Sequence, residues 1–104
     1  MAGGPVTSET LPGLRCEIDD LDAQIVRLLA ARLQVVERVV QVKQRDGLPA
    51  NIPERVEEVV AAARHRAEAE GVPPDLAELL WRDLVSWTIA YEDRHLAIEG
   101  NDGL

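Results

Sequence analysis

The sequence predicts an all-α fold, and three observations support this prediction. Apolar residues recur at alternating steps of four and three along the first half of the chain, which is the spacing of one helix face. The 46% hydrophobic content comes mostly from Leu, Val, Ala and Ile, and both Ala and Leu favour helices. Gly and Pro residues gather between the periodic segments. We therefore expect the 104 residues to form a single domain of three helices.

The first predicted helix begins near Pro12 or Gly13 and runs to about Arg45 without a breaker. It would be about 33 residues and about 50 Å long. Its apolar stripe consists of Leu14, Ile18, Leu21, Ile25, Leu28, Val35, Val39 and Val42. A helix of this length would extend beyond two shorter helices of its own chain. We therefore expect a second copy to cover the stripe in an intertwined homodimer with two-fold symmetry.

Two shorter helices follow. Residues 46–52 form the first connection, and Pro53 suits the first position of a helix that ends near Glu70. Residues 71–75 form the second connection, in which Asp75 and Glu78 have the spacing of a capping box. The third helix would end near Ile98. The predicted helical domain thus covers residues 12–98, with disordered tails at residues 1–11 and 99–104.

Charge and composition narrow the classes of function. The formal net charge of -8 and a pI near 4.6 argue against nucleic acid or an anionic membrane as partners. The single cysteine, Cys16, excludes an internal disulfide and a cysteine-based zinc site. We find no signal peptide at the N-terminus and no apolar run of about 18 residues that would cross a bilayer. We expect a cytoplasmic protein without a metal site.

Arg32 occupies a position in the apolar stripe where Leu or Val would be expected. A guanidinium group buried there is costly unless it is paired, so either a carboxylate of this protein or an anionic ligand should meet it. Lys43 lies about 16 Å further along nearly the same face, so the two cations could bracket one small molecule. Arg15 lies about 26 Å before Arg32 and would reach that molecule only from a second, antiparallel copy. Arg55, near the start of the second helix, could add a further cation, although Arg15, Lys43 and Arg55 could equally be solvated surface charges.

The third predicted helix places Thr88 and Glu92 at the end of an apolar stripe that begins at Trp81. Glu92 could form an ion pair with an arginine, or it could supply a carboxyl group to a ligand pocket. The arginines available for such a pair are Arg27, Arg38 and Arg94. The sequence contains no phosphate loop, dinucleotide fingerprint or nucleophile elbow.

Together these residues resemble the all-helical class of chorismate mutases, a group that also includes isochorismate pyruvate lyase. The resemblance covers about residues 14–96. It is carried by Leu14-Arg15, Ile18, Leu21-Asp22, Ile25, residues 28–30, Arg32, Lys43 and Pro53-Glu54-Arg55. It implies an intertwined homodimer of three-helix chains that rearranges chorismate to prephenate, a pericyclic reaction of a small dicarboxylate without a cofactor. It also implies a role in aromatic biosynthesis, and a second enzyme of the shikimate pathway is a candidate partner.

The resemblance also assigns roles by position. Arg32, together with Arg15 of the other chain, would bind the two carboxylates of the substrate. Lys43 would donate a hydrogen bond to the ether oxygen as charge builds there during C–O cleavage. Arg55 and Thr88 would complete the binding pocket.

Three departures from the family pattern concern the substrate. Glu92 stands where many members have Gln, and it would need a proton in order to stabilise the ether oxygen. Ile52 and Val56 stand where typical mutases have acidic residues that hold the ring hydroxyl. Two related reactions therefore stay open, namely salicylate formation from isochorismate and rearrangement of 4-amino-4-deoxychorismate. A third alternative is a non-catalytic helical dimer that binds a partner protein or an aromatic metabolite.

Overall fold

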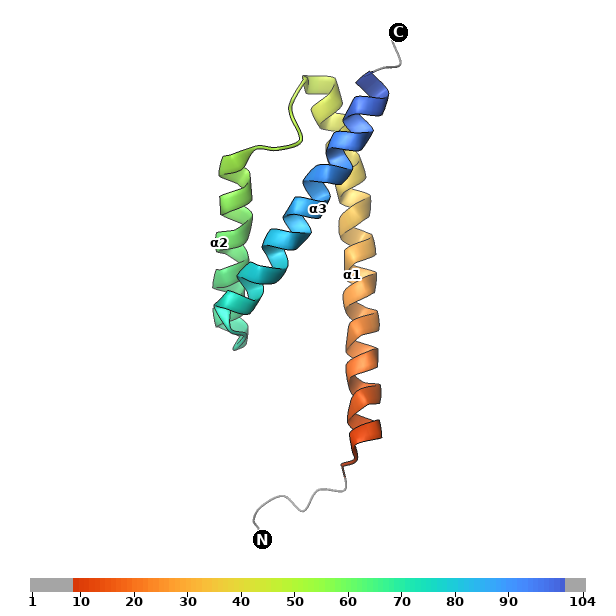
Figure 1. Ribbon diagram of the computed structural model, residues 1–104, viewed down its shortest axis with the longest axis vertical. Helices are drawn as coiled ribbons and strands as arrows, with labels where there is room; N and C mark the ends of the chain where they lie inside the picture. The colour runs from red at the N-terminus through yellow and green to blue at the C-terminus, as the bar shows by residue number, and fades with distance from the viewer. Residues whose placement is uncertain (1–8, 101–104) are drawn as a thin grey trace. The chain divides into compact units, whose positions relative to one another are not determined.

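The computed structural model describes residues 9–100, the last three of them by backbone alone, and contains three helices in chain order (Figure 1). They are α1 (Leu11–Asp46), α2 (Pro53–Glu70) and α3 (Pro74–Gly100). This confirms the predicted all-α fold, and the boundaries differ from the predicted ones by at most two residues. Of the disordered tails that we predicted at residues 1–11 and 99–104, residues 1–8 and 101–104 lie outside the described residues, whereas Leu11 and residues 99–100 are helical, which corrects the prediction there. None of the described helices is both long and apolar enough to cross a membrane.

Glycines and a threonine set the ends of the helices. Thr10 caps α1, because its Oγ1 accepts a hydrogen bond of 3.1 Å from the amide of Gly13. α1 ends at Gly47, which has a φ of +69°, and α2 ends at Gly71, which has a φ of +75°. In each turn the glycine and the next residue donate amide hydrogen bonds back to the last helical turn, as in a Schellman motif. These turns fix where α2 and α3 begin.

The capping box that we predicted at Asp75 and Glu78 does not form in the expected way. α3 begins two residues earlier than predicted, at Pro74, and Asp75 Oδ1 accepts a hydrogen bond from the amide of Leu76. The carboxylate of Glu78 instead meets Arg64 and Arg82. Pro74 can take the first helical position at no cost because it has no amide hydrogen to satisfy.

The chain divides into two compact units, Met1–Val35 and Val36–Leu104, which we describe separately. The described part of the N-terminal unit is essentially the first 25 residues of α1. Its apolar stripe is exposed within the single chain, from 37% for Leu14 to 70% for Leu28. Arg32 is half-buried, whereas Arg15 is exposed.

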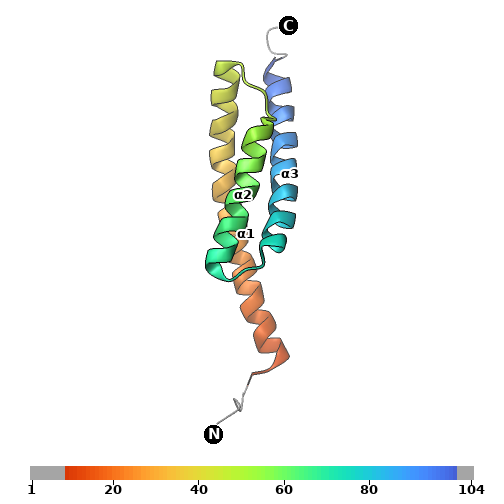
Figure 2. The ribbon, with the colours of Figure 1, turned by 90° about the vertical axis from the view of Figure 1, so that its left-hand side faces the viewer.

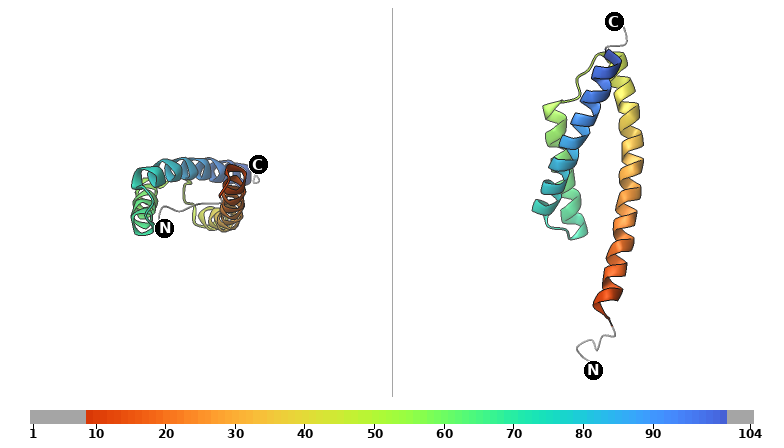
Figure 3. Two further views of the ribbon diagram at one scale, coloured as in Figure 1. Left: turned by 90° about the horizontal axis from the view of Figure 1, so that it is seen from below. Right: turned by 45° about the vertical axis from the view of Figure 1, so that its right-hand side comes forward.

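The C-terminal unit holds the end of α1 together with α2 and α3. α2 and α3 form a hairpin and lie side by side near their connecting turn (Figures 2 and 3). Ala63 and Ala67 of α2 are buried against Ala77 of α3, and Trp81 covers this small core. Such short side chains allow the two helix backbones to approach closely.

In the same unit, α1 buries two residues that lie outside the predicted stripe, Val36 and Val40. Val42 of the stripe is 42% exposed, and Val35, the last residue of the N-terminal unit, is 52% exposed. Lys43 follows Val36 and Val40 at the i, i+4, i+7 spacing of one helix face. The end of α1 therefore has two apolar faces, one turned into its own chain and one left open.

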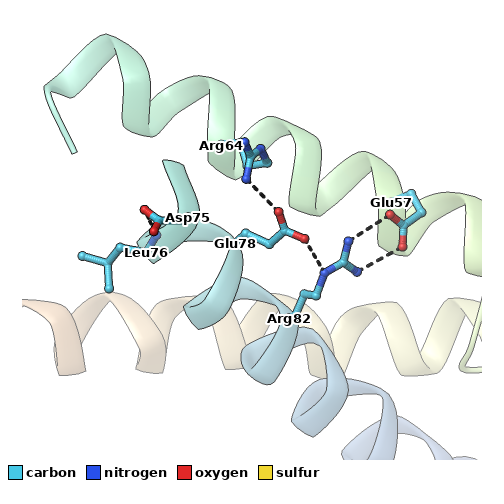
Figure 4. A network of polar contacts seen from close by, with 6 residues as sticks. All are labelled: Glu57, Arg64, Asp75, Leu76, Glu78 and Arg82. Carbon is cyan, nitrogen blue, oxygen red and sulfur yellow. Dashed lines mark hydrogen bonds and ion pairs between the residues drawn. The ribbon is translucent and has the colours of Figure 1, made fainter. Parts of the chain in front are cut away.

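A network of hydrogen bonds and ion pairs connects α2 and α3 (Figure 4). Arg82 of α3 donates two hydrogen bonds of 3.1 Å to the two carboxylate oxygens of Glu57 on α2. It also donates one of 2.8 Å to Glu78, whose other oxygen lies 2.7 Å from Arg64 Nη1. Because this bidentate arrangement has a fixed geometry, it sets the register of α2 against α3.

Candidate active site

Lys43 and Glu92 form a largely buried ion pair between the end of α1 and the C-terminal half of α3. Lys43 Nζ lies 2.7 Å from Glu92 Oε1, and the two side chains are only 14% and 7% exposed. The ammonium group also donates a hydrogen bond of 2.8 Å to the backbone carbonyl of Ala50. Three segments of the C-terminal unit thus meet at one ammonium group: the end of α1, the α1–α2 connection and α3.

Local structure places each of these groups. Lys43 lies in the last turn of α1, where the helix dipole favours a positive charge. Its own carbonyl accepts a hydrogen bond of 2.8 Å from the amide of Leu48, which folds the connection back toward the helix. Ala50, further along this connection, is only 4% exposed. The side chain of Lys43 therefore donates a hydrogen bond to a carbonyl that would otherwise be buried without a donor.

Thr88 lies one helical turn before Glu92, and both are among the buried polar residues of α3. Thr88 Oγ1 donates a hydrogen bond of 2.7 Å to the carbonyl of Leu84. Val85, the residue after Leu84, is also buried. The predicted face of α3 therefore exists, and it carries two polar groups among apolar ones.

A second contact joins α1 to α3 beside the ion pair. Tyr91 Oη donates a hydrogen bond of 3.3 Å to Glu37 Oε1. Partial burial, and after it the negative charge of Glu37, raises the pKa of Tyr91 above its usual range. The Tyr91 ring stacks on the ring of Trp87 with 5.3 Å between their centroids, and its centroid lies 4.1 Å from that of the His95 ring. This contact holds the segment of α3 that carries Glu92.

The residues predicted at the start of α2 lie just after Ala50. Ile52 is the N-cap residue, half-buried and with an extended backbone, and Val56 is half-buried one turn later. Arg55 is 69% exposed and lies 3.3 Å from Glu58. In the single chain, Arg55 is thus a surface cation.

The structure brings together Lys43 and Glu92, which are 49 residues apart in sequence. This corrects the ion-pair alternative at Glu92, because the partner is the lysine and not an arginine. Arg15 and Arg32 belong to the N-terminal unit, and their place in a shared site stays a prediction. Within the described residues, no three His, Cys, Asp or Glu side chains are grouped so that they could hold a metal ion.

Sequence reasoning missed the carbonyl of Ala50 and the contact between Tyr91 and Glu37. A backbone carbonyl has no signature in a sequence. One signal did exist for Lys43: it is the only lysine in the chain, and all other basic residues except the two histidines are arginines. An ammonium group offers three donors on a compact charge, which the planar guanidinium group cannot reproduce.

Comparison with known proteins supports a common family. Residues 14–93 match the family described as chorismate mutase type II. A T-protein of Haemophilus influenzae is 40% identical over 86 residues, which cover 83% of this chain and 23% of that protein. A T-protein of Enterobacter agglomerans is 50% identical over 68 residues, covering 65% of this chain and 18% of the relative.

The chain therefore spans only about a fifth of the length of these two T-proteins. A protein of Methanocaldococcus jannaschii named chorismate mutase is 26% identical over 88 residues, which cover 85% of this chain and 89% of the relative. The family match includes both members of the buried ion pair, as well as Arg15, Arg32 and Arg55. With most of its length matched, and with the three-helix architecture described above, the chain belongs to the chorismate mutase type II family.

Proposed function

We propose that this chain rearranges chorismate to prephenate without a cofactor, at a site built around Lys43 and Glu92. The observation that carries the proposal is the buried Lys43 ammonium group, held by Glu92 and by the Ala50 carbonyl. In a rearrangement that breaks a C–O bond, negative charge develops on the ether oxygen. A donor fixed in a largely dry environment stabilises that charge without having to reorganise. Membership of the family and the chorismate mutase of Methanocaldococcus jannaschii support the choice of substrate.

The positive side chains would bind the substrate. Arg32 and Arg15 would each hold a carboxylate, a role that suits the bidentate guanidinium group. Arg55 would support the ring end, and Thr88 would line the pocket beside Glu92. Because Lys43 and Glu92 neutralise one another, the binding of a dicarboxylate depends mainly on the arginines.

The proposal includes a homodimer in which Arg15 of a second copy completes the site. Its support is the apolar stripe of α1, where Leu21, Ile25 and Leu28 are 54% to 70% exposed in the single chain. A soluble helix rarely leaves such a continuous stripe in water, and a second copy of the same helix would bury it. Val35 and Val42 extend the open face toward the end of the helix.

Glu92 would have to be protonated to assist the reaction, because a carboxylate would repel the developing charge on the ether oxygen. A protonated Glu92 would become a donor, as the Gln of typical mutases is. Ile52 and Val56 would leave the ring hydroxyl of chorismate without an acidic partner. We expect this loss to weaken the binding of chorismate without redirecting the reaction.

The first experiment is to incubate the pure protein separately with chorismate, isochorismate and 4-amino-4-deoxychorismate, and to resolve the products by chromatography. We expect prephenate from chorismate as the fastest reaction. Salicylate and pyruvate from isochorismate, or turnover of the amino analogue alone, would assign a different substrate. In that case Ile52, Val56 and Glu92 would be the residues that reset it.

The Arg32→Ala variant separates an enzyme from a non-catalytic helical dimer. An enzyme should lose turnover while keeping its fold, which far-ultraviolet circular dichroism would show. A non-catalytic helical dimer should keep its binding function in the Arg32→Ala variant, because Arg32 would then hold no substrate.

A further inference from the structure

The Lys43 ammonium group has three N–H donors, and two of them already have acceptors: Glu92 Oε1 at 2.7 Å and the Ala50 carbonyl at 2.8 Å. We propose that Ala50 is a positioning residue, whose carbonyl aims the third donor of Lys43 at the ether oxygen of the substrate. The proposal rests on the proposed function, since it concerns the step that Lys43 would assist.

The need for a second acceptor follows from the lysine side chain itself. Its four-carbon stem has many rotamers, and a single acceptor would leave the ammonium group free to swing around it. Acceptors on two different elements, α3 and the α1–α2 connection, fix both the position of Nζ and the direction of its remaining donor. Catalysis by electrostatic stabilisation depends on donors that are oriented before the reaction begins.

The connection that carries Ala50 is itself held in place. Lys43 contacts it twice, because its backbone carbonyl accepts from Leu48 and its Nζ donates to Ala50. Gly47, which precedes both contact residues, allows the turn that brings them back to Lys43, with a φ of +69° that other residues rarely adopt. The burial of Ala50 then leaves little room for its carbonyl to move.

A purely structural role would also explain this hydrogen bond, since a buried carbonyl needs a donor. The two roles differ in what the loss of the bond changes. A structural bond affects the unfolding of the protein, whereas a positioning bond affects kcat. The test must therefore weaken the acceptor without changing any side chain.

The direct test replaces the amide between Ala50 and Asn51 by an ester in a chain assembled by peptide ligation. An ester carbonyl is a weaker acceptor, and all side chains stay the same. The matched control places the ester one bond later, between Asn51 and Ile52, where the weakened carbonyl belongs to an exposed residue. Because Lys43 is the only lysine, a ¹⁵N label on its Nζ gives one ammonium signal, whose hydrogen exchange reports on the bond.

We expect the Ala50–Asn51 ester to lower kcat about fivefold, with KM within about twofold of the parent value. Exchange of the Lys43 ammonium hydrogens should become faster, and the control ester should change neither quantity. An unchanged kcat, an equal loss in both esters, or a change confined to KM would each overturn the proposal. So would a Lys43 signal in the parent that exchanges as fast as that of free lysine.

If the ester chain does not fold, two glycine variants decide the question. Gly47 and Gly71 both have a positive φ, and in neither case would an added Cβ meet another atom. Gly47→Ala and Gly71→Ala therefore introduce the same backbone strain into two different turns. A loss of kcat in Gly47→Ala alone supports the proposal, and equal rates in the two variants overturn it.

The proposed function can fail separately. A parent chain that does not turn over chorismate would remove both proposals. A parent chain that is active and unaffected by the Ala50–Asn51 ester would remove only the role of Ala50.

Discussion

At the scale of single residues, the site depends on a buried pair of opposite charges, Lys43 and Glu92. Lys43 and Glu92 are removed from water, so each needs the other in order to be tolerated. The same low exposure strengthens any interaction that the ammonium group makes with a substrate. In the proposed mechanism, stability and catalysis therefore make opposite demands on Glu92, since its charge supports Lys43 but would oppose the reaction.

Lys43→Met should destabilise the protein by about 3 kcal/mol at pH 7, because it leaves Glu92 charged, buried and unpaired. The double variant Lys43→Met/Glu92→Leu should recover most of this loss, since it removes both charges. The free energy of unfolding can be measured by urea denaturation. If the single and double variants are equally destabilised, the pair does not behave as a buried ion pair.

Glu92→Gln should keep or raise the rate of prephenate formation. In the proposed mechanism the amide is a neutral donor near the ether oxygen, whereas a carboxylate there would repel the developing charge. Initial rates of both proteins with chorismate check this. A marked loss of rate in the variant would contradict the need for a neutral donor at position 92.

At the scale of the elements, the α2–α3 hairpin combines a small alanine core with an exposed polar network. Hydrogen bonding to Arg82 holds the pKa of Glu57 and that of Glu78 below their ordinary value of about 4.5, and Arg64 adds to the effect at Glu78. A carboxyl group with a lowered pKa in the folded state contributes stability above its unfolded pKa. This contribution is lost as the pH falls through the folded pKa.

Arg82→Met should therefore lower the Tm at neutral pH by more than it does in acid. Above pH 4.5 the parent gains from charged Glu57 and Glu78 beside Arg82, and this gain should vanish as the two groups become protonated. Arg66→Met, which removes an equal charge from an exposed position of α2, is the matched control. A Tm difference between parent and Arg82→Met that stays constant from pH 7 to strong acid would argue against the network.

At the scale of the whole molecule, the apolar residues of α1 have different surroundings in different parts of the helix. Val36 and Val40 are buried within the chain, whereas the stripe from Leu14 to Leu28 is open to solvent. In the proposed dimer, α1 would thus belong to two sites at once. It would supply Lys43 and Arg32 to its own site and Arg15 to the site of the second copy.

Mixing two inactive variants tests this sharing. Arg15→Ala and Arg32→Ala should each abolish activity, but a heterodimer would have one site with both changes and one site with neither. After complete subunit exchange of equal amounts, we expect roughly a quarter of the parent activity. Exchange must be demonstrated independently, for example with differently tagged chains. No recovery after proven exchange would mean that Arg15 acts within its own chain or not at all.

Much of the fold followed from local chemistry. As predicted, α2 begins at Pro53 and ends just before Gly71, because proline and glycine each restrict or permit backbone conformations directly. The prediction of a capping box at Asp75 was wrong because Pro74 already occupies the first position of α3. Glu78 instead pairs with Arg82, four residues later on the same helix, and with Arg64 of α2, which the local sequence does not place beside it.

The site was predictable only in part, for a related reason. Helical spacing placed Thr88 and Glu92 on one face, but no spacing joins Lys43 to a residue 49 positions later. The predicted stripe of α1 did not include Val36 and Val40, which the helix buries within its own chain, whereas Val35 and Val42 of that stripe are exposed. Tertiary contacts settle such choices, and they are not written in the local pattern.

The hydrogen bond from Lys43 to Ala50 has a consequence for how this protein can vary through evolution. The acceptor is a backbone carbonyl, which every amino acid supplies, so position 50 is constrained by the size of its buried side chain and not by its chemistry. Substitutions that fit the space would preserve the contact, whereas insertions or deletions between positions 43 and 50 would move the carbonyl away. The contact would then constrain the length of the α1–α2 connection, and a sequence alignment would not show this constraint as a conserved residue type at position 50.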